Sequence, residues 1–127
     1  MIIVVRILSG VLLLAHGLVH LLYLAPDVDA FSVESGRLPE QWRHPVAVVL
    51  LTATILGFSL VALSTWGVPG LASSWPVLTL VAAALSALLL VVFWDRQLVF
   101  GLTIDAALIA VAMWQPLWLH QLLQGTA

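Results

Sequence analysis

Residues 2–25 read IIVVRILSGVLLLAHGLVHLLYLA, and the length and apolar character of this stretch decide the fold class. A helix that crosses the hydrocarbon core of a bilayer needs about 20 apolar residues. Three further runs of this kind follow at residues 45–66, 75–94 and 98–119. Because lipid offers no water to the backbone, each run must satisfy its own polar groups as a helix. The sequence therefore predicts an all-α fold, a four-transmembrane-helix bundle that runs up-down-up-down, in one integral membrane domain over residues 1–127.

The composition supports this interpretation. Hydrophobic residues make up 63% of the chain and charged residues only 8%, whereas soluble domains carry about 25% charged residues. We therefore expect the lipid bilayer to cover most of the surface. The net charge is −2 and no basic stripe is present, which argues against nucleic acid as a partner. The chain has no cysteine, which excludes disulfides, thiol catalysis and iron–sulfur clusters.

Two segments need a separate interpretation. Arg6 precedes a long apolar stretch, as in a signal peptide. The stretch exceeds the about 7–15 residues of a signal-peptide core, so we expect a retained helix.

The long connector, residues 26–44, holds Phe31, Leu38 and Trp42 among charged residues. It is either a short helix or lid on the membrane surface or an ordinary polar connector. Pro45 is predicted to open the second helix, since proline suits the first helical position.

Aromatic residues gather near the ends of the apolar runs, as they do in the belts at membrane–water interfaces. The belt on the side of the long connector comprises Tyr23, Trp42 and Trp94, and the opposite belt comprises Trp66, Trp75, Trp114 and Trp118. Of the four arginines, all but Arg6 lie on the side of the long connector: Arg37, Arg43 and Arg96. The positive-inside rule then favours a cytoplasmic connector.

Polar residues within the apolar runs are the best indicators of function, because ionisable groups in a membrane tend to face the interior of a bundle. In the first run, residues at spacings of three and four form one helical stripe: Arg6, Ser9, Leu13, His16, His20 and Tyr23. Asp105 lies in a similar stripe of the fourth run. At about 1.5 Å per residue, His16 and Asp105 both fall roughly 4–5 Å from the midplane, on the same side. We therefore predict a His16–Asp105 hydrogen bond.

Two other helices contribute to the same layer. Thr52 falls at about the depth of His16, Ser86 lies slightly deeper, and His20 lies one turn nearer to the connector. Three hypotheses remain open for this layer. It is structural, with polar groups that satisfy one another; or it is a pocket for a small hydrophobic molecule; or it binds a metal or haem. The candidate ligand-binding residues are His16, His20, Asp105, Thr52, Ser86 and Tyr23, and the candidate metal ligands are His16, His20 and Asp105.

The segment Arg6-Ile-Leu-Ser-Gly10, with His16-Gly17-Leu18 and His20-Leu21 after it, resembles the start of the DoxX-like membrane proteins. His20 stands where that family usually has lysine. Residues 86–94 and 101–105 look like a widespread group of uncharacterised four-helix bacterial proteins. The resemblance implies a four-helix bundle in the bacterial inner membrane. Some relatives in the broader group are linked to quinone or thiol oxidation complexes, and the absence of cysteine argues against a thiol role.

No catalytic signature is present in the sequence: it has no paired carboxylates, no glycine-rich phosphate loop and no serine elbow. We therefore expect a non-enzymatic binding or accessory protein for a small hydrophobic ligand. The alternative is a redox component or oxidoreductase subunit that binds quinone, haem or a divalent metal. Small residues four apart, as in Ala53–Gly57 and Ala106–Ala110, let helices approach closely. They serve either packing within the chain or a homodimer or larger membrane complex.

Overall fold

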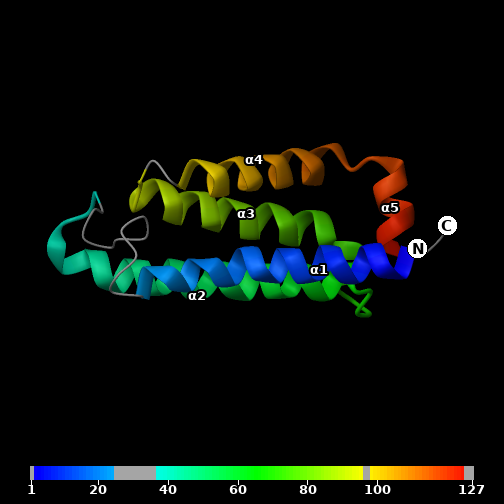
Figure 1. Ribbon diagram of the computed structural model, residues 1–127, viewed down its shortest axis with the longest axis horizontal. Helices are drawn as coiled ribbons and strands as arrows, with labels where there is room; N and C mark the ends of the chain where they lie inside the picture. The colour runs from blue at the N-terminus through cyan, green and yellow to red at the C-terminus, as the bar shows by residue number, and fades with distance from the viewer. Residues whose placement is uncertain (1, 25–36, 96–97, 125–127) are drawn as a thin grey trace.

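The computed structural model describes residues 2–24, 37–95 and 98–124, and these residues form helices and short connections. The main elements are α1 (Ile2–Leu18), the 3₁₀ segment η1 (Val19–Leu24), α2 (Glu40–Thr65), α3 (Trp75–Val92), α4 (Val99–Trp114) and α5 (Leu117–Gln124). Helices α1 to α4 lie along one long axis, and consecutive helices run in opposite directions (Figure 1). Helix α2 packs against α1 and α3, and α3 packs against α4. The predicted all-α class is confirmed for the described residues.

Three helical segments are long and apolar enough to cross a membrane: Ile3–Tyr23, Glu40–Thr65 and Ala72–Val92. Helix α4 is also apolar but shorter. Large apolar side chains point outward along α1 and α4, among them Ile3, Leu12, Phe100 and Met113, which are each at least two-thirds exposed. So much exposed apolar surface is unfavourable in water. The structure is therefore compatible with an integral membrane protein.

Helix α4 ends at Trp114, earlier than the predicted end at residue 119. Gln115 adopts a left-handed conformation with φ 48° and caps the helix, and Pro116 cannot continue it. Helix α5 then turns away from α4 and crosses toward the start of α1 (Figure 1). The sixteen residues of α4 span about 24 Å.

The start of α2 corrects a second boundary. The helix begins at Glu40, and Pro45 lies inside it, so the prediction that Pro45 opens the helix is wrong. Residues 40–44 of the long connector are thus helical. Just before them, the backbone N–H of Arg37 donates to the carbonyl oxygen of Val92 at 3.1 Å, which ties this segment to the end of α3. Phe31 lies outside the described residues.

The aromatic belts stay a prediction, and the structure shows how exposed their side chains are. Trp42, Trp66, Trp114 and Trp118 expose much of their side chains, whereas Trp75 is buried in the core. Tyr23 is also buried.

Close helix contacts depend on glycine at two positions. A Cβ on Gly57 would lie 3.0 Å from the Cβ of Ala82 in α3, which shows that Gly57 serves packing within the chain. A Cβ on Gly17 would lie 2.7 Å from the Cβ of Phe58 in α2. Real side chains do not approach this closely, so α1 can lie against α2 only because residue 17 has no side chain.

We predict that Gly17→Ala lowers the thermal unfolding midpoint in detergent micelles. Overpacking a core costs about 1–3 kcal/mol, which exceeds the about 0.5–1 kcal/mol that alanine gains over glycine in a helix. Gly101→Ala is the matched control, because its Cβ would meet only a terminal methyl of Leu90, at 3.2 Å. A Gly17→Ala midpoint equal to or above that of Gly101→Ala would contradict this packing.

Candidate functional site: a buried His–Asp–Ser–His network

Asp105 joins three helices through hydrogen bonds to both of its carboxyl oxygens. His16 Nε2 in α1 lies 2.8 Å from Oδ1, and the Ser86 hydroxyl in α3 lies 2.5 Å from Oδ2. The Ser86 oxygen also lies 2.9 Å from Nε2 of His20. The result is one chain of contacts that runs His16–Asp105–Ser86–His20. The predicted His16–Asp105 pair is therefore present, and Ser86 and His20 belong to the same network.

His20 completes the network by bonding back to its own helix. Its Nδ1 lies 3.0 Å from the carbonyl oxygen of His16 and 3.1 Å from that of Gly17. Both carbonyls belong to the last turn of α1, where backbone acceptors lack their usual helical partners. The change from α-helix to the 3₁₀ segment at Val19 thus supplies the acceptors that fix the His20 ring.

The network is almost completely shielded. Asp105 and Ser86 are fully buried and His20 is 1% exposed, while the His16 side chain is 10% exposed. A buried polar group without a partner costs about 1–3 kcal/mol, and a charged group costs more. The hydrogen bonds remove this cost for Asp105, Ser86 and His20 and for Nε2 of His16. Phe58 of α2 closes the network from the remaining side, with its ring edge-to-face on His16 at a centroid distance of 4.9 Å.

Two predicted site residues lie elsewhere. Thr52 is exposed on α2, whereas Thr54, two residues further on, is buried. The Tyr23 hydroxyl donates to the carbonyl oxygen of Phe93 at 3.1 Å and ties η1 to the end of α3. The structure therefore brings together His16, His20, Ser86 and Asp105, and leaves Thr52 and Tyr23 outside the network.

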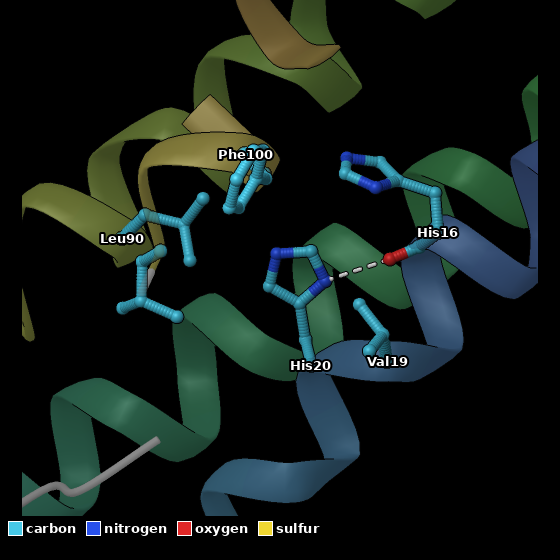
Figure 2. A pocket seen from close by; sticks show the side chains of 7 residues that line it. His16, Val19, His20, Leu90 and Phe100 are labelled. Atoms are coloured by element: carbon cyan, nitrogen blue, oxygen red, sulfur yellow. Dashed lines mark hydrogen bonds between the residues drawn. The ribbon is translucent and has the colours of Figure 1, made fainter. Parts of the chain in front are cut away.

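A pocket of about 200 Å³ lies beside the two histidines. Its lining comprises His16, Val19, His20, Leu90, Leu98, Phe100 and Gly101, so α1, η1, α3 and the start of α4 all contribute. Figure 2 shows both imidazoles pointing into one space that Leu90 and Phe100 close on the other side. The histidines are the only polar side chains of this lining. The apolar lining residues gave no signal in the sequence, because they resemble every other apolar residue of these helices.

His16 offers the pocket one unused nitrogen. Its Nε2 donates to the Asp105 carboxyl, so Nδ1 of the neutral ring keeps a lone pair. Within the described part of the chain, no side chain or backbone group bonds to this Nδ1. A hydrogen-bond acceptor therefore faces an otherwise apolar space.

The predicted metal set is not formed. Among the described residues, no group of three histidine, aspartate or glutamate side chains is arranged to hold a metal ion. The physical reason is that His20 directs Nδ1 at backbone carbonyls and Nε2 at Ser86, so neither nitrogen is available beside His16 and Asp105.

Comparisons with protein-family models, with curated proteins and with solved structures give no match. The resemblance of the first helix to DoxX-like proteins therefore stays a prediction.

We predict that Asp105→Asn is far less destabilising than Asp105→Leu. Asparagine keeps an oxygen that accepts from His16 and an N–H that donates to Ser86. Leucine leaves the Nε2–H of His16 without its acceptor, at about 1–3 kcal/mol, whereas the Ser86 hydroxyl can still donate to Nε2 of His20. The thermal midpoints of both variants in detergent micelles measure this difference. Equal midpoints would show that the network does not stabilise the fold.

Proposed function

We propose that helices α1 to α4 all cross the bilayer, as a four-helix up-down-up-down bundle in the bacterial inner membrane with the long connector on the cytoplasmic side. The contacts of Asp105 support a fourth crossing, because they place the middle of α4 at the depth of His16 and Ser86. Helix α4 is short for about 30 Å of hydrocarbon, and the break at Gln115 lets α5 lie along the interface with Trp118 exposed.

The absence of native cysteine makes this topology testable with single introduced cysteines. Gln41, Pro69 and Gln121 are exposed and lie in the first turn of α2, between α2 and α3, and in α5 after α4. In sealed vesicles, we expect an impermeant thiol reagent to label Pro69→Cys and Gln121→Cys from the same side and Gln41→Cys from the other. Labelling of Gln121→Cys together with Gln41→Cys would show that α4 does not cross.

We further propose that the protein binds a small apolar molecule that donates one hydrogen bond, such as a single ring with a hydroxyl group. The observation that carries this proposal is the free Nδ1 of His16 at the edge of an apolar pocket. The lone pair on Nδ1 of His16 accepts a hydrogen bond, so a ligand hydroxyl can bond to it and a ligand carbonyl cannot. The ligand reaches the pocket from the lipid, since Val19 and Phe100 of the lining are partly exposed on the outer surface.

The volume of the pocket limits the size of the ligand. About 200 Å³ is below the roughly 300–1,000 Å³ of pockets that hold drug-sized molecules. A single ring fits this space, and the tail of a larger lipid-soluble molecule would have to extend into the bilayer. Haem needs a much larger cavity, so the pocket favours a ring alcohol or phenol over haem.

The alternative hypothesis, a redox component that binds quinone, predicts which form of the quinone this pocket prefers. A quinone has only carbonyl acceptors at its ring, whereas the reduced hydroquinone has two hydroxyl donors. A redox component that used this pocket would therefore bind the reduced form more tightly, and a comparison of benzoquinone with hydroquinone separates the two forms.

We predict that the protein in nanodiscs binds 4-fluorophenol more tightly than 4-fluoroanisole, which has the same ring but no donor. One neutral hydrogen bond contributes about 1 kcal/mol, or about fivefold in Kd. The ¹⁹F resonance of each probe reports its binding. Val19→Phe fills the pocket and should abolish the difference, while the control Val11→Phe, on the outer surface of α1, should keep it. Equal binding of both probes, or no effect of Val19→Phe, would overturn the proposal.

A further inference from the structure

The hydrogen-bond partners of His20 fix the position of one of its protons. Carbonyl oxygens only accept, and Nδ1 of His20 lies within hydrogen-bond distance of two of them, on His16 and Gly17. Nδ1 must therefore carry a hydrogen. In a neutral His20 the other nitrogen, Nε2, is then an acceptor, and in a charged His20 it is a donor.

Ser86 stands between two groups but has a single hydroxyl proton. Its oxygen lies 2.5 Å from Oδ2 of Asp105 and 2.9 Å from Nε2 of His20. If the Ser86 proton points to His20, the contact with Asp105 is a hydrogen bond only when Oδ2 carries a proton. If it points to Asp105, the contact with His20 is a hydrogen bond only when Nε2 carries a proton. Both contacts are satisfied together only when one extra proton is present on Asp105 or His20.

We infer that Asp105 and His20 share one proton, which passes between them through the Ser86 hydroxyl. In the first arrangement, Asp105 is a neutral acid, Ser86 donates to Nε2, and His20 is neutral. In the second arrangement, Asp105 is a carboxylate, Ser86 donates to Oδ2, and His20 is an imidazolium ion. His16 donates its Nε2–H to Oδ1 in both arrangements, so its hydrogen bond survives the transfer.

The transfer itself is balanced. The Oδ2–H bond of Asp105 breaks as that proton moves to the Ser86 oxygen, and the original Ser86 O–H bond breaks as its proton moves to Nε2 of His20. No electron moves, and the net charge of the network is unchanged. The Asp105–Ser86 contact of 2.5 Å and the Ser86–His20 contact of 2.9 Å form the continuous path that the transfer requires.

The transfer changes the wall of the pocket, although the total charge stays constant. His20 lines the pocket, whereas Asp105 lies behind it and does not. In the second arrangement, the positively charged ring of His20 therefore lies at the wall of the pocket, and the negatively charged Asp105 lies behind it. This inference concerns the network behind the pocket and does not require the proposed ligand to bind.

Nitrogen NMR of the protein in nanodiscs, with ¹⁵N-labelled histidine, tests the shared proton. In the wild type, we expect the His20 Nε2 shift to lie between the values of protonated and bare imidazole nitrogen. Asp105→Asn reproduces the first arrangement permanently, because its N–H donates to Ser86 and is not released. The Nε2 shift should then move to the value of a bare acceptor nitrogen. The same Nε2 shift in both proteins would overturn the inference.

Infrared spectroscopy tests independently whether the Asp105 carboxyl carries the proton. The wild type should show the C=O stretching band of a buried carboxylic acid, which Asp105→Asn removes and the control Asp95→Asn leaves in place. Its absence from the wild type would also overturn the inference.

If Asp105→Asn does not fold, Ser86→Ala replaces it. Loss of the hydroxyl should trap the proton, so the Nε2 shift moves to one of its two limiting values, and a shift that stays intermediate would contradict a path through Ser86.

Discussion

The fully buried carboxyl of Asp105 is the constraint on which the rest of this structure depends. A carboxyl group away from water requires hydrogen bonds to both oxygens, whichever protonation state it adopts. Helix α4 carries no partner for it, so α1 must present His16 and α3 must present Ser86 at the same depth. Apolar helices in lipid slide and rotate against one another at little cost, because lipid and leucine are equally apolar. The network restricts that freedom and selects one arrangement of the helices.

The same constraint explains why the pocket lies where it does. Contacts of α4 are made mainly with α3, and α1 packs mainly with α2, so the imidazoles of His16 and His20 fill the space between α1 and α4. Flat rings leave part of that space empty near Leu98 and Phe100. The pocket therefore borders the histidine that satisfies Asp105. Its one unpaired acceptor, Nδ1 of His16, follows from the use of Nε2 by the carboxyl.

The depth of a polar residue along its helix could be predicted from the sequence. The rotation of each helix about its axis and the orientation of single side chains could not. The rise per residue placed His16, Ser86 and Asp105 in one layer, and the structure shows their hydrogen bonds. Thr52 was predicted to belong to this layer, but the rotation of α2 exposes Thr52 and buries Thr54, and a nearly uniform apolar helix does not reveal its rotation. The break of α4 depends on the left-handed Gln115, although Pro116 was a signal for it. The ring of His20 directs Nδ1 at backbone carbonyls, and the His16–His20 spacing on which the metal hypothesis rested does not determine this orientation.

The central claim is that Asp105 binds α1 through His16 within the membrane. Solid-state NMR of the protein in lipid bilayers measures this contact directly, as the dipolar coupling between ¹⁵N at Nε2 of His16 and ¹³C at the carboxyl carbon of Asp105. The structure places Nε2 2.8 Å from Oδ1 and predicts a strong coupling. A spectrum without this coupling, in protein that is shown to be folded, would contradict the account.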